Sequence, residues 1–378
     1  MEKGHTVTTS SPDVVVIGGG IMGTAIAWVL SQRGARVRLL ERQELAREAS
    51  LTSAGIISPP SSRHGARVDL ALRAYRRYPS WLDELAEQSG MSVGHVRTGE
   101  IDVAMEENLD DLRERFDWQE RQDMQPEWLD DAELRRREPG VHPAFAAAIF
   151  NPHAGSVLLG QVAEAQARAA SSLGAKIETF ASVSSIIVKD GNATGVLVNG
   201  EFLPAGQVVV AAGAWSRLLA NSLGTPIPTM PVRGQMLAIG HAPQPVRTII
   251  AGGGGYIVPR ADGTIAVGAT EEHSAGFHTQ VTPAGIAWLV DLLRSLAPTL
   301  ADGVLVDTWA GLRPGTIDGE PIIGPIPGVN NVWAATGHFR SGALLAPSTA
   351  EVVADGLLSG VVDPSIAAFS AARFINVQ

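Results

Sequence analysis

One stretch, residues 13–42, constrains the fold of this chain more than any other. Val14–Ile17 is a run of β-branched residues that is typical of a strand buried on both faces. Three glycines follow it at the spacing G-x-G-x-x-G: Gly18, Gly20 and Gly23. The residues after them have the composition of a packed helix, and a second apolar strand then ends at Glu41. Strand, helix, strand and acid in this register predict a Rossmann-like βαβ unit.

Each part of this unit has a role in binding a dinucleotide. The first glycine allows a tight turn, the second lets a pyrophosphate approach the backbone, and the third lets helix and strand touch. The phosphates then lie at the helix N-terminus, where free N–H groups and the helix dipole favour an anion. The Glu41 carboxylate can accept hydrogen bonds from ribose hydroxyls. We therefore favour dinucleotide binding over a merely glycine-rich turn.

Composition excludes several classes of protein. The chain has 378 residues, of which 45% are hydrophobic and 18% charged, as expected for a soluble globular protein of two domains. A net charge of −10 argues against nucleic acid as a partner. The absence of cysteine excludes disulfides, thiolate metal sites and a cysteinyl-linked cofactor, and we assign no metal site. Four glycines interrupt the apolar run Val14–Leu30, so we expect no membrane segment and a cytoplasmic location.

The rest of the chain mixes helical and strand patterns. Residues 1–12 are polar and predict a frayed end. Asp190-Gly191 and Asn199-Gly200 predict hairpin turns. Helices are expected at Asp69–Ser89, Asn108–Arg115, Gln161–Leu173, Thr282–Leu296 and Ser341–Leu358, and strands at Glu100–Ala104, Lys176–Phe180, Val183–Val188, Thr194–Val198, Gln207–Ala211, Val304–Ala310 and within 230–268.

A second informative motif is V-V-V-A-A-G-A-W, Val208–Trp215. A buried strand that ends in Ala-Ala-Gly can bring its backbone, at Gly213, against a cofactor from the far side of the sheet. Alone it would be a core strand followed by a turn. Together with the first βαβ unit it indicates a flavin dinucleotide rather than a nicotinamide.

A third motif, Trp309–Pro325, places Arg313 directly before a proline in a glycine-rich segment. Arginine holds a carboxylate through a planar fork of donors, and its charge persists at any working pH. Arg313 could therefore bind a substrate carboxylate. It could equally be a structural residue that pairs with a carboxylate such as Asp318.

A fourth motif, Ala335–Pro347, predicts a strand, a glycine loop and a helix whose N-terminus points inward. That helix end would stabilise negative charge on a reduced flavin. His338 lies in the loop, and we interpret it as a structural hydrogen-bonding residue without an acid–base role.

These motifs together resemble the FAD-dependent family of the D-amino-acid-oxidase type, and within it the glycine oxidases associated with thiamine biosynthesis. The likeness rests on G-G-G-I-M-G, S-A-G-I-I, G-L-R-P-G-T-I-D-G-E-P and G-H-F-R-S-G-A-L-L-A-P, and it extends from Asp13 to about Phe374. It implies an α/β and α+β fold: a discontinuous Rossmann-like FAD-binding domain (13–92, 150–225 and 312–374) with an inserted antiparallel-sheet substrate domain (93–149 and 226–311).

The resemblance also implies roles for individual residues. It assigns non-covalently bound FAD to Gly18, Gly20, Ile21, Met22, Gly23, Glu41, Arg42, Ser50, Ala54, Gly55, Ile56, Val183, Gly213, His338, Phe339, Arg340, Ser341, Gly342, Ala343 and Leu344. Arg313 matches the carboxylate-binding arginine, and Tyr256 matches its tyrosine partner. Two departures bear on the substrate: Gly252–Gly255 carry no polar side chain where relatives place a histidine, and Glu271 stands where an apolar residue is usual.

From this resemblance we expect oxidative deamination of glycine or a similar small primary or secondary amino acid, by hydride transfer to the flavin. Oxygen is the implied acceptor, giving H2O2, and we expect a homo-oligomer. Alternatives within the family are a sarcosine oxidase or a D-amino acid oxidase or dehydrogenase. A different class, a non-catalytic nucleotide-binding protein, would leave Arg313 and Tyr256 without a purpose.

Overall fold

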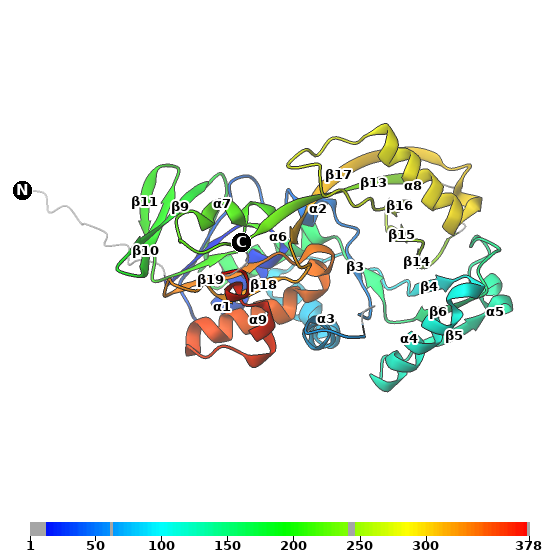
Figure 1. The fold of residues 1–378 in the computed structure, drawn as a ribbon, viewed down its shortest axis with the longest axis horizontal. Coiled ribbons are helices and arrows are strands. Elements are labelled where there is room, and N and C mark those ends of the chain that lie inside the picture. Colours follow the sequence, from blue (N-terminus) through cyan, green and yellow to red (C-terminus); the bar gives the residue numbers. More distant parts are fainter. Residues whose placement is uncertain (1–12, 61–62, 241–245, 376–378) are drawn as a thin grey trace, which may run out of the picture.

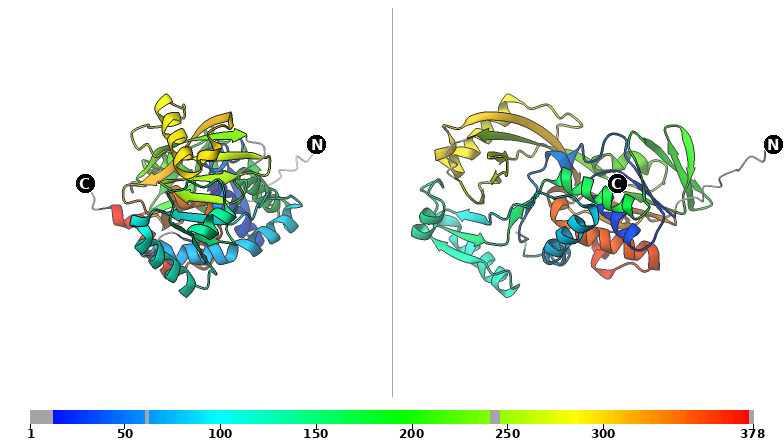
Figure 2. Two further views of the ribbon diagram at one scale, coloured as in Figure 1. Left: turned by 90° about the vertical axis from the view of Figure 1, so that its right-hand side faces the viewer. Right: turned by 180° about the vertical axis from the view of Figure 1, so that it is seen from behind.

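The computed structural model describes residues 13–60, 63–240 and 246–375, so the predicted frayed end, 1–12, lies outside the described residues. Two sheets divide the molecule into two lobes, which Figures 1 and 2 show side by side. One lobe is built on a six-stranded, mostly parallel sheet and the other on an eight-stranded, mostly antiparallel sheet. The predicted fold class, a Rossmann-like domain joined to an antiparallel-sheet domain, is confirmed.

The six-stranded sheet is organised around the strand that the sequence identifies first. Strand β1 (Val14–Ile17) is fully buried and lies parallel to β2 (Val37–Leu40) on one side and to β12 (Gln207–Val210) on the other. The sheet continues outward through β8 (Lys176–Glu178) beyond β2, and through β19 (Val332–Thr336) and the antiparallel edge strand β18 (Ile322–Pro325) beyond β12. Parallel strands buried on both faces explain why their sequences are continuous apolar runs.

Helices cover one face of this sheet. Helix α1 (Ile21–Gln32) is buried from Ile21 to Ser31 and packs against α6 (Leu159–Ser172) and α9 (Gly342–Ser359). Helix α3 (Arg67–Ser89) lies outside them, and its Trp81 meets Trp28 of α1 edge to face, with ring centroids 4.6 Å apart. Because α1 has neighbours on all sides, it is apolar all round rather than amphipathic.

A small sheet of three strands covers the other face: β9 (Val183–Lys189), β10 (Asn192–Val198) and β11 (Glu201–Pro204). Asp190 and Gly191 have φ values of 50° and 75°, and Asn199 and Gly200 have 49° and 88°. Positive φ at both central residues is the geometry of a type I′ hairpin turn, so both predicted turns are confirmed.

The second lobe contains the eight-stranded sheet, in the order β17-β13-β16-β15-β14-β4-β6-β5. All its pairs are antiparallel except β14 with β4. The strands are β4 (Glu100–Ala104), β5 (Glu127–Asp130), β6 (Ala147–Asn151), β13 (Thr229–Gly240), β14 (Ile249–Gly252), β15 (Gly255–Pro259), β16 (Thr264–Gly268) and β17 (Val304–Thr316). Helix α8 (Pro283–Leu296) packs on β13 to β16, and α4 (Leu109–Arg121) and α5 (Asp131–Arg137) pack on β6 and β5.

Strand β17 is longer than the sequence predicts and joins the two lobes. It pairs with β13 from Val304 to Thr316, so it runs across the predicted domain boundary at 311/312. The division into a discontinuous FAD-binding domain and a substrate domain stays our proposal.

Among the described residues, no single helix is both long and apolar enough to span a membrane, although one pair of segments bent by 106°, Phe339–Ser359 with Pro364–Phe374, meets the same length and composition together.

Candidate active site

A pocket of about 420 Å³ lies where the carboxyl ends of β1, β12 and β19 face strands β13, β15 and β17 of the other lobe. This volume is within the range of ligand and cofactor sites, roughly 300–1,000 Å³. Most of the predicted site residues line it: Gly18, Gly20, Ile21, Met22, Glu41, Arg42, Ser50, Val183, Gly213, Tyr256, Arg313, His338, Phe339, Arg340, Gly342 and Ala343. The two lobes therefore share one pocket.

The glycine turn has the geometry that its spacing predicts. Gly18 has φ of 111°, and a Cβ built on it would lie 2.5 Å from the carbonyl oxygen of Ala211. A Cβ on Gly23 would lie 1.9 Å from the carbonyl oxygen of Gly18, so this position needs glycine for helix α1 to touch the turn. Gly23 therefore supports the pocket from behind without lining it.

The N-terminus of α1 is open to an anion. Its N-cap residue, Gly20, has no side chain, and the first turn contains no acidic residue. Ser50 accepts a hydrogen bond of 2.9 Å from the Ile21 amide, so its hydroxyl partly caps α1 besides lining the pocket. A helix end with amides still free beside close-packed glycines is the donor set that a pyrophosphate requires, and this end of the pocket fits FAD.

Glu41 fixes the turn as well as facing the pocket. Its carboxylate accepts from the amide of Gly19 at 2.7 Å and from the amide of Gln43 at 2.9 Å. A carboxylate has about four acceptor positions, so two backbone bonds leave capacity for a ribose hydroxyl. The sequence predicted the ribose contact and missed the bond to Gly19, which ties the end of β2 to the glycine turn.

The motif after β12 reaches the pocket as predicted and brings an aromatic residue that we did not single out. Ala211, Ala212 and Gly213 line the pocket, and Trp215 follows them. The Arg42 guanidinium lies 3.9 Å from the centroid of the Trp215 ring, a cation–π contact beside the predicted ribose site. The sequence signal that could have identified this contact was the aromatic residue two positions after Gly213.

Five further predicted site residues lie behind the pocket lining rather than in it. They are Ala54, Gly55, Ile56, Ser341 and Leu344. Gly55 has φ of 68°, and a Cβ on it would lie 1.8 Å from the carbonyl oxygen of Val157, so its role is to let two backbones cross. Ala54 and Ile56 pack against the apolar cluster that contains Tyr256.

At the other end of the pocket, Arg313 of β17 is held by the backbone. Its Nη1 donates to the carbonyl oxygen of Thr270 at 2.9 Å. Gly234 of β13 makes room for it, because a Cβ there would lie 2.3 Å from Nη1 and 2.6 Å from Cζ. Asp318, the suggested structural partner, pairs instead with Arg373 at 2.7 Å. Among the described residues no carboxylate pairs with Arg313, so its guanidinium keeps donors for a carboxylate from outside the chain.

Tyr256 stands on the neighbouring part of the same sheet. It lies on β15 between Ala251 of β14 and Gly268 of β16, and it packs with Met236 and Trp309. Both Tyr256 and Arg313 line the pocket, so the structure brings this predicted pair to one site. Met236 and Gly234 also line it and were not foreseen, because nothing local distinguishes them in β13.

Gly252–Gly255, the first departure from the family pattern, form the turn between β14 and β15. Gly253 and Gly254 have φ of 56° and 81°, which suits a two-residue hairpin turn. They present no polar side chain to the pocket.

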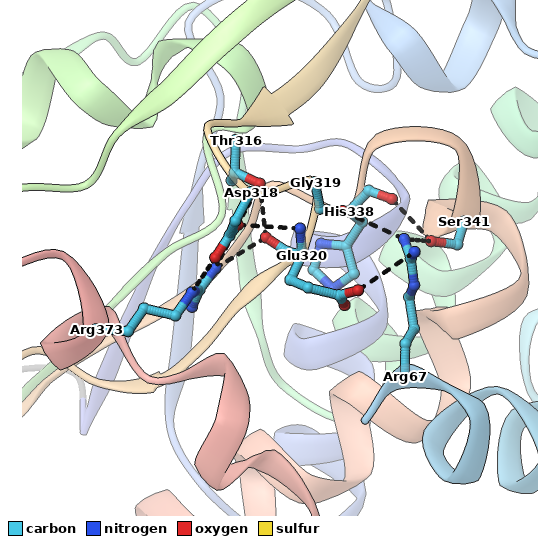
Figure 3. Close-up of polar contacts among 8 residues, drawn as sticks. All are labelled: Arg67, Thr316, Asp318, Gly319, Glu320, His338, Ser341 and Arg373. Atoms are coloured by element: carbon cyan, nitrogen blue, oxygen red, sulfur yellow. Dashed lines mark hydrogen bonds and ion pairs between the residues drawn. The ribbon is translucent and has the colours of Figure 1, made fainter. Parts of the chain in front are cut away.

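His338 and the start of α9 form the third wall of the pocket, and a polar network holds them in place (Figure 3). His338 is 3% exposed, and its Nε2 lies 3.2 Å from the hydroxyl of Thr349. Burial, with the positive charge of Arg67, lowers the pKa of His338 to about 3, so the ring is neutral at physiological pH.

Arg67, from α3, links this wall to the loop after β17. It pairs with Glu320 at 3.4 Å and donates to the carbonyl oxygen of Gly319 at 3.3 Å. Ser341 donates from its hydroxyl to the His338 carbonyl oxygen at 2.9 Å, and Arg67 lies 3.5 Å from the same hydroxyl (Figure 3). Ser341 thus holds the turn from His338 to Ser341 in place, and the residues on both sides of Ser341 line the pocket.

Comparison with known proteins agrees with this geometry. The family described as "FAD dependent oxidoreductase" (DAO) matches residues 13–356. The bifunctional protein ThiO/ThiG of Synechocystis sp. is 35% identical over 98% of this chain, and this chain spans about half of that protein's length, 55%.

Two solved structures have the same fold. The glycine oxidase of Geobacillus kaustophilus superimposes with a TM-score of 0.90 at 32% identity, over 97% of this chain and 100% of its own. An iminodiacetate oxidase of Chelativorans sp. BNC1 superimposes with a TM-score of 0.86 at 27% identity, over 94% of this chain and 98% of its own.

Proposed function

Because the chain belongs to the DAO family of FAD-dependent oxidoreductases, we propose that it oxidises glycine or a similar small primary or secondary amino acid. The products are the imine and, with O2 as acceptor, H2O2; water then converts the imine to the oxo acid and releases the amine. One observation carries the proposal: Arg313, an arginine without a carboxylate partner among the described residues, lines a pocket whose opposite end fits FAD.

The protein's main contribution is to position the substrate. Arg313 can hold the substrate carboxylate through two parallel hydrogen bonds, and the backbone bond to Thr270 keeps the guanidinium from rotating. Tyr256 lies on the same sheet and can donate its hydroxyl to the same carboxylate. Two fixed contacts on one end of a small amino acid orient its α-carbon towards the rest of the pocket.

FAD, when bound, supplies the acceptor for two electrons and the α-hydrogen. The residues suited to hold it are the glycine turn and α1 N-terminus for the pyrophosphate, Glu41 for the ribose, and the segment from His338 to Ala343 for the flavin. The neutral His338 adds no charge there, and the N-terminus of α9 favours negative charge near it. No described side chain is needed as a base, because the amine reacts in its neutral form.

The test is anaerobic mixing of the purified FAD-bound protein with single amino acids. Glycine, sarcosine, D-alanine and D-proline are each mixed with it while flavin absorbance is followed. We expect bleaching with at least one, and loss of that bleaching in Arg313→Ala although FAD stays bound. If none of these amino acids reduces the flavin, the proposal is contradicted and the non-catalytic alternative is favoured. The amino acid that reduces the flavin fastest distinguishes glycine oxidation from sarcosine and D-amino acid oxidation.

Similarity to ThiO/ThiG supports a place in thiamine biosynthesis for the proposed reaction. The cytoplasmic location and the homo-oligomer stay predictions; light scattering on the purified chain would test the second.

A further inference from the structure

The segment after β16 runs from the substrate end of the pocket to its mouth. Thr270 uses its carbonyl oxygen to hold Arg313. Glu272, two residues on, is fixed to β13: its backbone exchanges two hydrogen bonds with Arg233, and its carboxylate accepts from Gln235 at 2.6 Å and pairs with Arg233 at 2.5 Å. The backbone on both sides of Glu271 is therefore anchored.

Because of this anchoring, the Glu271 side chain points away from β13. Thr270 and Glu272 both direct their side chains to Gln235. The Thr270 hydroxyl accepts a hydrogen bond from the backbone amide of Gln235 at 2.9 Å, and the Glu272 carboxylate accepts one from its side-chain amide. In extended backbone, successive side chains alternate between two faces. Glu271 accordingly leaves β13 and meets Arg340 at 3.7 Å and His273 at 3.0 Å.

Arg340 belongs to the pocket. It lines the pocket while 48% of its side chain remains exposed, so it stands at the mouth. The ring of His273 also meets that of Phe339, another lining residue, with centroids 6.5 Å apart. Two contacts thus join the segment after β16 to the wall at the start of α9.

The mouth therefore contains the guanidinium of Arg340, whose positive charge is balanced by the Glu271 carboxylate. Arg313 meets the first carboxylate of a substrate, and an unpaired Arg340 would attract a second one. Glu271 neutralises Arg340, so Arg340 leaves no free positive charge at the mouth to attract that second carboxylate. Arg340 and Glu271 are both substantially exposed, and at such a site the interaction between two unit charges changes affinity by roughly 2- to 5-fold.

We propose that Glu271 is a specificity determinant that excludes amino acids bearing a second carboxylate and keeps the pocket selective for monocarboxylates. The inference rests on the proposed function, since it assumes that Arg313 holds the first carboxylate. The contrast with the iminodiacetate oxidase is informative, because a protein of the same fold is named for a dicarboxylate amine.

The first experiment measures binding without turnover. Methoxyacetate and diglycolate are ethers with the shapes of sarcosine and iminodiacetate; they differ by one carboxylate and cannot form an imine. Each is titrated into the FAD-bound protein, and Kd is read from the perturbation of the flavin spectrum. We expect Glu271→Gln to lower the Kd of diglycolate by roughly 2- to 5-fold relative to that of methoxyacetate, and 0.5 M NaCl to reduce this gain.

Two variants control for other effects. Glu201→Gln removes the same charge on the exposed strand β11, which lies well away from β16 and the segment after it (Figure 1), and should leave the Kd ratio unchanged. Glu271→Gln/Arg340→Gln should lose most of the gain, because the gain depends on the released Arg340 charge. The kcat/KM ratio of iminodiacetate to sarcosine should follow the same order across the four proteins.

An unchanged Kd ratio in Glu271→Gln, or an equal change in both ligands, would overturn the inference. A gain that persists without Arg340 would overturn it too. If neither ether perturbs the flavin in the unmodified protein, the proposed function fails instead.

Discussion

Gly234→Ala tests whether the position of the Arg313 guanidinium controls activity. The added methyl would lie 2.3 Å from Nη1 and 2.6 Å from Cζ of Arg313, whereas unstrained contacts need about 3.5 Å. The guanidinium must therefore move by about 1 Å. It can do so, because it is the end of a flexible side chain, but the 2.9 Å bond to the Thr270 carbonyl oxygen is then strained or lost.

The cost to folding is small. Losing the bond to Thr270 costs about 0.5–1.5 kcal/mol. Replacing a strand glycine by alanine returns about 0.5–1 kcal/mol, since the unfolded chain loses freedom. These terms nearly cancel, so we expect Tm within a few degrees of the unmodified protein. A displacement of about 1 Å at a positioning group costs up to roughly 100-fold in rate, and we expect kcat/KM to fall by roughly 10- to 100-fold.

The assay is anaerobic stopped-flow reduction of the flavin, expressed per mole of bound FAD, together with thermal unfolding. Gly240→Ala is the matched control: it lies on the same strand, and its new methyl would meet Val306 at an acceptable 3.4 Å, so rate and Tm should both hold. Unchanged kcat/KM in Gly234→Ala, with the protein folded and FAD bound, would refute the assignment of Arg313 as the carboxylate-binding residue.

Three further predictions concern the cofactor and the pH dependence of stability. Acid precipitation should release all FAD into the supernatant, because the chain has no cysteine to attach it; colour kept in the pellet would reveal a covalent link. Glu41→Gln should raise the Kd for FAD by roughly 5- to 30-fold, because the glutamine side chain has one acceptor oxygen fewer for the Gly19 N–H and the ribose. An unchanged Kd when FAD is titrated into the apoprotein would exclude this role. Burial, with the charge of Asp102, raises the pKa of Glu100 to about 8. Between the unfolded value near 4.5 and this value, the native state keeps a proton on Glu100 that the unfolded chain has lost, so the contribution of Glu100 to stability falls as pH rises, by up to about 1.4 kcal/mol per unit. In Glu100→Gln this slope should disappear, and parallel Tm curves of the two proteins from pH 5 to 8 would show that Glu100 is not buried as a neutral acid.

The cofactor end of the site could be predicted because its signals are local. The strand Val14–Ile17, the glycines after it and Glu41 lie within one βαβ unit, where spacing along the chain determines spacing in the fold. The hairpin turns at Asp190-Gly191 and Asn199-Gly200 are predictable for the same reason.

The support for Arg313 could not be predicted, because it depends on the register of strands far apart in sequence. Gly234 faces the guanidinium only because β13 pairs with β17 so that Val232 lies opposite Arg313. The choice between a substrate-binding and a structural Arg313 likewise required knowing that Asp318 is taken by Arg373, 55 residues further along the chain. Strands β5 and β6 and the extension of β17 were missed because their short or glycine-rich segments lack clear alternation.

The continuity of β17 has a consequence for recombining this protein with its relatives. A chimera that exchanges the substrate lobe at 311/312 would cut a strand that pairs with β13 along its whole length, and would take Gly234 and Arg313 from different parents. Junctions placed after Thr316, with β13 and β17 inherited together, keep that register intact. Chimeras designed to change substrate preference in this fold should therefore take β13 and β17 from the same parent.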